Sequence, residues 1–290
     1  MPSNSELRKF KGWTKPGPVI SRDQIDKAQA SIDSTVTIDS LCGDYRIFQY
    51  SNGHRFSTDD VLVAWYASQN APQRATALDM GCGLASVGMM FAWKSYESKL
   101  VGIEAQHRSL MLAEKSIELN GLQDRYELRH FDLRDPGALR DGEVFDVILT
   151  SPPYFAVDAG VLGNHPQKIE CRFEIRGTVA DYLIRAQNHL SPGGIVCGVF
   201  PTAQEPRLWE AFSQTSLFCL RYIEVILSEG EKSALTLFIG CHERDFPPTF
   251  VENCRISPLK DPNLTIRNSK GVPTREYLAL KVSMGLPPTI

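Results

Sequence analysis

The sequence predicts an α/β protein in which a seven-stranded, mostly parallel and doubly wound sheet carries helices on both faces. Short apolar runs of strand length alternate along the chain with segments of helical periodicity, an order typical of parallel sheets. The last two predicted strands are separated only by residues 229–233. Because so short a connection suits a hairpin, we expect the last strand to be antiparallel.

The expected elements follow one another from residue 45 onward. A strand over 45–50 ends in a hairpin-type turn at Ser51-Asn-Gly53. A helix then begins at Ser57-Thr-Asp-Asp60, where a hydroxyl and a carboxylate three residues later form a capping box. The remaining strands are expected at 75–80, 100–103, 126–131, 144–149, 195–200, 220–227 and 234–241, with helices around 87–91 and over 108–120 and 179–190.

Charge is unevenly distributed along the chain. The net charge is −3, but residues 1–30 carry +3 and residues 255–290 carry +4. We expect an N-terminal extension over 1–40, one domain over 41–245, and a basic segment over 246–290 packed on that domain. Basic ends on an acidic body suit a polyanionic partner, although solvated termini without a partner explain them equally well.

Composition excludes several classes of protein. With 42% hydrophobic and 22% charged residues the chain is typical of soluble globular proteins, and no apolar run is long enough to span a membrane. The first residues lack the apolar core of a signal peptide. The seven cysteines form no Cys-x-x-Cys pair and no cluster with zinc spacing. We therefore expect a cytoplasmic protein without a structural metal.

The most specific motif directly follows the apolar strand 144–149. Two prolines end that strand, because neither can donate a ladder hydrogen bond, and an aromatic residue comes next. Such a turn at the carboxyl end of a strand can hold a flat, amino-bearing ring by stacking and accept hydrogen bonds from its NH2 group. The candidate catalytic residues are Ser151, Pro152, Pro153 and Tyr154.

A glycine turn follows the strand 75–80. Gly81 and Gly83 allow a tight bend and a close approach of the backbone to a ligand. A dinucleotide fingerprint would have Gly or Ala at position 86, where this chain has Ser86, and Asp79 would repel a pyrophosphate. The turn therefore points away from NAD and towards a ligand with an ammonium group.

Two further acids end the next two predicted strands. Glu104 is placed to accept both hydroxyls of a ribose, and Asp132 is placed to accept the exocyclic amine of an adenine. A surface charge at a strand end and a turn aspartate are the structural alternatives. At the start of the first helix, Ser57 can approach the same ligand, although capping alone explains it.

Together these motifs resemble a class I S-adenosylmethionine-dependent methyltransferase, whose amino-methylating members carry (Asn/Asp/Ser)-Pro-Pro-(Tyr/Phe/Trp) after the fourth strand. Segments 53–62, Arg172-Phe-Glu174 and Asn263-Leu-Thr-Ile-Arg resemble the bacterial tRNA1(Val) adenine-N6 methyltransferase family over roughly residues 43–282. The resemblance implies a Rossmann-like fold, S-adenosyl-L-methionine as cofactor and RNA, above all tRNA, as partner. It also implies substrate-binding roles for Phe155, Arg172 and Glu174.

Two residues depart from that family. Ser151 replaces its usual asparagine and Ala85 replaces a third glycine. Ser-Pro-Pro-Tyr also resembles DNA cytosine-N4 methyltransferases, although those generally place this motif before the glycine turn. The acceptor therefore stays open among adenine N6 in RNA or DNA, cytosine N4 and a protein glutamine amide. A non-catalytic RNA-binding subunit with the same fold is the remaining alternative.

Overall fold

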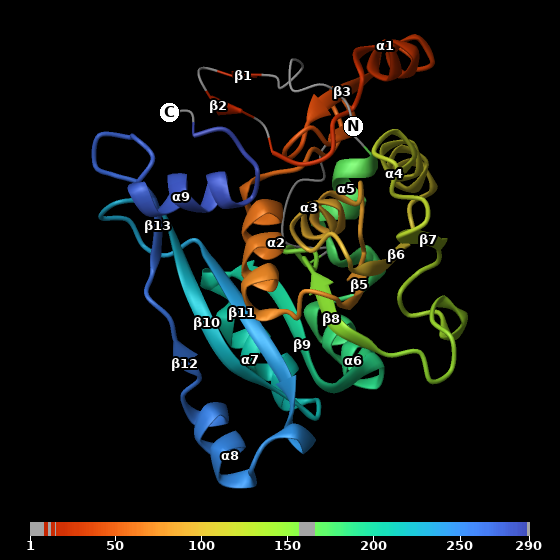
Figure 1. Cartoon of the computed structure of the whole chain (residues 1–290). Helices are drawn as coiled ribbons and strands as arrows, with labels where there is room; N and C mark the ends of the chain where they lie inside the picture. The colour runs from red at the N-terminus through yellow and green to blue at the C-terminus, as the bar shows by residue number, and fades with distance from the viewer. Residues whose placement is uncertain (1–8, 11–12, 15, 157–165, 289–290) are drawn as a thin grey trace.

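The computed structural model describes residues 9–10, 13–14, 16–156 and 166–288, and Figure 1 shows a central sheet covered by helices. Within these residues the sheet has nine strands in the order β12-β10-β11-β9-β8-β5-β6-β7, with β13 also paired to β10. The strands are β5 (Thr76–Met80), β6 (Lys99–Glu104), β7 (Tyr126–His130), β8 (Phe145–Thr150), β9 (Leu190–Pro201), β10 (Leu217–Ser228), β11 (Leu235–His242), β12 (Leu259–Lys260) and β13 (Leu264–Arg267).

The direction of the strands confirms the predicted fold class. β5 pairs in parallel with β6 and β8, and the parallel pairing continues to β7 on one side and to β9 on the other. β11 lies antiparallel between β9 and β10, as its short connection predicted. The difference from the prediction is at the edge, where β12 and β13 pair in parallel with β10 and bring the sheet from seven strands to nine.

Helices cover both faces of the sheet. They are α1 (Arg22–Ala30), α2 (Thr58–Asn70), α3 (Ser86–Lys94), α4 (His107–Leu119), α5 (Pro166–Arg172), α6 (Val179–His189), α7 (Glu205–Ser213), α8 (Pro248–Ile256) and α9 (Arg275–Ser283). Short 3₁₀ turns are η1 (Pro136–Ala138), η2 (Glu174–Arg176), η3 (Thr202–Gln204) and η4 (Glu243–Asp245). α2, α3 and α4 pack on one face and α6 and α7 on the other, so two apolar cores sandwich the sheet.

A hairpin precedes the sheet. β3 (Val36–Ser40) pairs antiparallel with β4 (Arg46–Tyr50), and the backbone of β4 bonds to Ser116 and Asn120 of α4 at 3.0 and 2.8 Å. The turn predicted at 51–53 leads from β4 into α2, as expected, and the hairpin partner of β4 is the preceding strand β3. Further upstream, β1 (Lys9–Phe10) pairs with β2 (Trp13–Thr14). The division of the chain at residues 40 and 245 stays a prediction, but the hairpin crosses the first boundary and β12 and β13 join the sheet beyond the second.

The helix termini follow from local chemistry. The Ser57 capping box predicted for α2 is present, and Thr178 caps α6 in the same way. α4 ends at Leu119 with Asn120 as its C-cap, and Gly121 then adopts φ +66. Among the described residues, no helix is both long and apolar enough to cross a membrane.

Candidate active site

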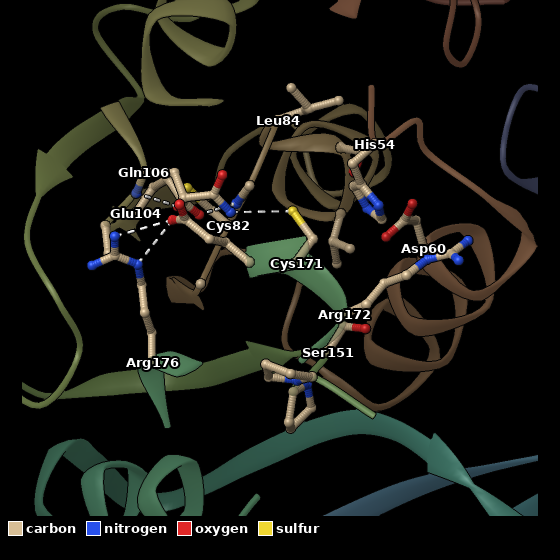
Figure 2. Close-up of a pocket in the computed structure, with 18 of the residues that line it drawn as sticks. His54, Asp60, Cys82, Leu84, Glu104, Gln106, Ser151, Cys171, Arg172 and Arg176 are labelled. Carbon is tan, nitrogen blue, oxygen red and sulfur yellow. Dashed lines mark hydrogen bonds and ion pairs between the residues drawn. The ribbon is translucent and has the colours of Figure 1, made fainter. Parts of the chain in front are cut away.

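A cavity of about 640 Å³ opens where the parallel strands end (Figure 2). Open α/β sheets bind ligands at this edge, because the loops that follow the strands converge there. Most of the residues singled out in the sequence line the cavity: Ser57, Asp79, Gly81, Gly83, Glu104, Ser151, Pro152, Pro153, Tyr154, Phe155 and Arg172. Two of them, Asp132 and Glu174, do not line it.

The glycine turn after β5 forms the floor of the cavity. Gly81 and Gly83 have φ of +65 and +56, a region that favours glycine. A Cβ on Gly81 would lie 2.4 Å from the hydroxyl oxygen of Tyr182, whereas a Cβ on Gly83 would meet nothing within 4 Å. Gly83 therefore borders open space, and a side chain there would occupy room that a ligand can fill.

Asp79 at the end of β5 is buried and anchored on one side only. Its Oδ2 accepts hydrogen bonds from the hydroxyl of Tyr126 at 2.8 Å and from the amide of Gly88 at 2.9 Å. Within the described residues no bond reaches Oδ1, so this oxygen remains available to a ligand. Burial raises the pKa of Asp79 to about 6, although both hydrogen bonds act in the opposite direction.

Glu104 at the end of β6 reaches back to the glycine turn. Its two oxygens accept hydrogen bonds from the amides of Gly83 at 2.8 Å and Gln106 at 2.6 Å. Burial raises the pKa of Glu104. The side-chain amide of Gln106 donates to the sulfur of Cys171 at 3.3 Å, while its Oε1 is buried without a partner in the described chain. The carboxylate and this carbonyl oxygen both suit a ligand rich in hydrogen-bond donors.

The Pro-Pro turn after β8 is held rigidly. Pro152 and Pro153 are buried, and the backbone carbonyl of Tyr154 accepts a hydrogen bond from Gln204 at 2.8 Å. The hydroxyl of Tyr154 donates to Asp59 of α2 at 2.9 Å, and its ring meets the edge of Phe200 at a centroid distance of 6.2 Å. The backbone, the hydroxyl and the ring of Tyr154 thus each have a partner.

Phe155 and Arg172, both predicted to bind the substrate, line the cavity. The backbone segments that carry them are hydrogen-bonded to each other. The amide of Phe155 donates to the carbonyl of Arg172 at 3.0 Å, and the amide of Glu174 donates to the carbonyl of Phe155 at 2.8 Å. The Phe155 ring is 41% exposed and packs against Phe173. Glu174 points elsewhere, because its buried carboxylate forms an ion pair with Arg207 of α7.

Asp132 lies just outside the cavity. Its carboxylate accepts three hydrogen bonds from Arg134, at 2.7, 2.9 and 3.0 Å, which lower its pKa. Its neighbours Phe131 and Leu133 line the cavity instead. In this structure Asp132 is therefore a turn aspartate, the structural alternative considered for it. Its role in binding adenine stays a prediction.

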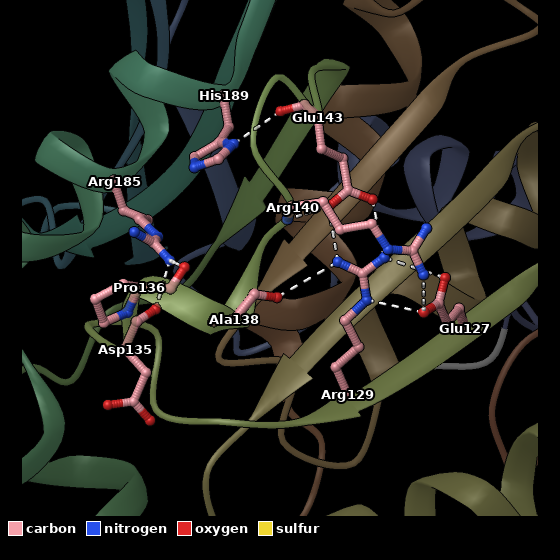
Figure 3. Close-up of polar contacts among 9 residues, drawn as sticks. All are labelled: Glu127, Arg129, Asp135, Pro136, Ala138, Arg140, Glu143, Arg185 and His189. Carbon is pink, nitrogen blue, oxygen red and sulfur yellow. Dashed lines mark hydrogen bonds and ion pairs between the residues drawn. The ribbon is translucent and has the colours of Figure 1, made fainter.

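The segment between β7 and β8 carries these two lining residues and is anchored by a polar network (Figure 3). Arg129 donates to both oxygens of Glu143 at 2.7 and 2.8 Å and to Glu127 at 2.9 Å. The carbonyl oxygen of Glu143 lies 2.7 Å from Nδ1 of His189, and Arg185 donates to the carbonyl of Asp135 at 2.6 Å. The segment is thus fixed at both ends, which holds Phe131 and Leu133 at the cavity.

Several lining residues were not predicted. Asp60, Gln106, Lys168, Cys171, Arg176 and Tyr182 all line the cavity. Burial, followed by the charge of Asp59, raises the pKa of Asp60 well above its usual range. In the sequence, Asp60 is fully accounted for as the carboxylate of the capping box. Nothing in the sequence therefore indicated that it also lines the cavity. Within the described residues, no group of three His, Cys, Asp or Glu side chains is arranged to hold a metal.

Residues 60–219 match the family model described as the methyltransferase small domain, which is more than half of the chain. The chain belongs to this methyltransferase family. The predicted resemblance is thereby confirmed, and S-adenosyl-L-methionine is the cofactor. This cofactor presents an ammonium group, two ribose hydroxyls and an adenine amine. The acceptors of Asp79, Glu104 and Gln106 and the open space at Gly83 fit such a ligand.

Relatives and solved structures agree with this assignment. A protein named tRNA1(Val) (adenine(37)-N6)-methyltransferase from Actinobacillus succinogenes is 28% identical over 192 residues, 66% of this chain and 78% of its own. A protein of the same name from Vibrio cholerae is 25% identical over 173 residues, 60% and 69% of the two chains. A predicted O-methyltransferase from Agrobacterium tumefaciens superposes with a TM-score of 0.59 at 15% identity, covering 79% of this chain and 98% of its own, and shows the shared fold.

Proposed function

We propose that this methyltransferase modifies the exocyclic N6 amine of adenine in RNA, with tRNA as its substrate. The observation that carries the proposal is the Ser151-Pro-Pro-Tyr154 turn, which lies on the wall of the same cavity as Asp79 and Glu104. A planar amine and the methyl donor would therefore share one site, as transfer between them requires.

The cofactor-holding residues are assigned by the groups they offer. Asp79 would accept from the ammonium group through Oδ1, and Glu104 would accept from the ribose hydroxyls. Gly81 and Gly83 keep the floor clear of side chains, and Ser57 borders the same space. When bound, S-adenosylmethionine supplies an electrophilic methyl group on a sulfonium centre.

The acceptor side uses orientation rather than a strong base. An exocyclic amine is a weak nucleophile, because its lone pair is delocalised into the ring. The Ser151 hydroxyl and the Pro152 carbonyl would accept its two hydrogens and localise that lone pair, while Tyr154 would stack on the base and Phe155 would extend the platform. The base must enter unstacked, as in a loop or after flipping.

The names of the relatives support adenine in tRNA, at 25–28% identity. Ser151 keeps cytosine N4 as a second candidate, since the hydroxyl lacks the paired acceptor and donor of the asparagine found in the resembled family. Because the two products differ in the modified nucleoside, one assay separates them.

That assay supplies labelled methyl donor with total tRNA, rRNA, DNA or protein, followed by nucleoside analysis. N6-methyladenosine in tRNA is the expected product. N4-methylcytosine would move the assignment to the second candidate, and label on protein alone, or no label at all, would contradict a nucleic-acid function.

The variant Tyr154→Ala tests the role of the turn. It should abolish transfer and leave the binding of S-adenosylhomocysteine unchanged. Tyr96→Ala is the matched control, because Tyr96 is 66% exposed and precedes β6, at the opposite edge of the sheet. An equal loss of cofactor binding and transfer in Tyr154→Ala would show that its role is misassigned.

A further inference from the structure

Helix α5 presents two cations to the cavity. Lys168 and Arg172 are four residues apart, so they lie on one face of the helix about one turn from each other. Both line the cavity, Lys168 half-buried and Arg172 exposed. A ligand that enters the cavity from solvent can therefore contact both side chains.

The other arginines of the lining are already paired. Arg55 donates to Asp39 at 2.8 Å, and Arg176 donates to Glu170 at 3.0 Å. Among the described residues, no hydrogen bond or ion pair engages the side chain of Lys168 or that of Arg172. Their donors are thus the ones that remain for an incoming anion.

The helix that carries them is fixed against the site. Gln167, which precedes Lys168 in α5, is fully buried. Its Oε1 accepts from the amide of His54 at 3.0 Å, and its Nε2 donates to Ser109 of α4 at 2.9 Å. At its end, the bridge between Phe155 and Phe173 joins the helix to the Pro-Pro turn. These contacts join the helix that carries the two cations to the segment that follows Tyr154.

The position of the pair separates it from the cofactor acids. In Figure 2, Arg172 extends towards Asp60 and lies below His54, away from Glu104 and Gln106 on the other side of the cavity. Burial lowers the pKa of His54; the charge of Asp59 opposes this shift, and the charges of Arg172 and Lys168 add to it. Asp79 and Glu104 would repel an anion at the floor, whereas at this rim two cations face Asp59 and Asp60, and burial raises the pKa of Asp60 and so disfavours its charge.

We propose that Lys168 and Arg172 form a subsite for a backbone phosphate of the RNA acceptor, adjacent to the nucleotide whose base enters the cavity. This inference rests on the proposed function and extends it, since it specifies a contact with the substrate backbone. Arginine and lysine both bind phosphate, and such contacts fix register without reading sequence. A protein glutamine would bring no comparable anion.

The test uses Lys168→Gln, Arg172→Gln and the double variant, with Lys99→Gln as the matched control. Lys99 is exposed at the amino end of β6, opposite the cavity edge of the sheet. The probe is a fluorescent single-stranded oligoadenylate, compared with the same oligomer carrying uncharged methylphosphonate linkages. Affinity is measured over a salt series, and calorimetry measures binding of S-adenosylhomocysteine.

Removal of one cation that binds phosphate should make the slope of log K against log salt concentration shallower by about 0.7. We expect this for each single variant and not for Lys99→Gln, with unchanged affinity for S-adenosylhomocysteine. The preference of the wild-type protein for the charged oligomer should shrink in the double variant, and Lys168→Arg, which keeps the positive charge, should keep the wild-type slope.

Two results would overturn the subsite: an unchanged slope in the double variant, or a loss of S-adenosylhomocysteine affinity that matches the loss of oligomer binding. Either result leaves the proposed function intact if tRNA is methylated. Conversely, a wild-type protein that binds the oligomer through this pair but methylates no nucleic acid would contradict the proposed function alone.

Discussion

The hydroxyl of Tyr154 donates a hydrogen bond to a carboxylate oxygen of Asp59 at 2.9 Å, although the two residues are 95 positions apart in the chain. Burial, followed by the charge of Asp59, raises the pKa of Tyr154 well above its usual range, so the hydroxyl stays protonated and remains a donor. The first turn of α2 thereby fixes the ring that is proposed to stack on the acceptor base.

A double-mutant cycle measures what this bond contributes to methyl transfer. Tyr154→Phe and Asp59→Ala should each lower kcat/KM, with a coupling free energy of about 1 kcal/mol, typical of one hydrogen bond. The double variant should be no worse than the poorer single variant. Tyr96→Phe, at an exposed site outside the cavity, should have no effect. Strictly additive losses would mean that Asp59 acts independently of the tyrosine.

Asp79→Asn should stabilise the ligand-free protein at neutral pH. The pKa of about 6 in the folded state exceeds the unfolded value of 3.8, so stability from the protonated acid is complete below 3.8 and is lost as the pH rises through 6. This shift corresponds to roughly 3 kcal/mol. Asparagine keeps an oxygen for Tyr126 and Gly88 and carries no charge.

Denaturant unfolding of Asp79→Asn and the wild type, at pH 4 and pH 8, checks this prediction. The variant should gain relative stability at the higher pH and lose affinity for S-adenosylmethionine. A gap between the two proteins that does not change with pH would contradict it.

Ala85→Gly should increase stability. Ala85 precedes α3 with φ +60, and among the described non-glycine residues it is the one with positive φ. Relief of this strain outweighs the added freedom of glycine in the unfolded chain, which leaves a gain of roughly 0.5 kcal/mol. The same substitution should have the opposite effect at Ala279, an exposed position inside α9, where Ala279→Gly should lower stability by about 1 kcal/mol. Thermal unfolding of both variants tests the contrast.

Glu143→Gln should destabilise the segment between β7 and β8. Arg129 holds the pKa of Glu143 near 2, so the ion pair stabilises the fold above the unfolded value of 4.5 and loses this effect as the pH falls towards 2. We expect a loss of roughly 2 kcal/mol at pH 7, typical of a hydrogen-bonded charge. Unfolding measured from pH 7 to pH 3 should show the difference shrinking, and a constant difference would contradict the pairing.

The sequence predicted the strands of the central sheet and the helices α2, α3, α4 and α6, because their periodicity is local information, but it missed α7, which buries Leu208, Ala211 and Phe212. β12 and β13 were not predicted, because strands of two and four residues are too short to show a periodic pattern. Helix α5, with seven residues, was missed for the same reason. β3 was not predicted either, because this half-buried strand contains Thr, Asp and Ser.

Within the site, the predicted acids at the carboxyl ends of β5 and β6, Asp79 and Glu104, lie at the cavity. Asp132 does not, because Arg134, two residues later, competes for its carboxylate. Glu174 does not, because its partner Arg207 belongs to a helix that the sequence did not predict. Contacts of this range depend on packing, which a single sequence does not reveal.

The pairing of β12 and β13 with β10 bears on the order in which the chain can fold during synthesis. β10 is twelve residues long and mostly apolar, and in the described part of the chain β12 and β13 are the strands that pair with its outer edge. An unpaired edge of that length invites association with other chains. During synthesis the edge of β10 therefore stays unpaired until the residues of β12 and β13 have left the ribosome. A chain that terminates after β11 should aggregate rather than form a smaller soluble domain.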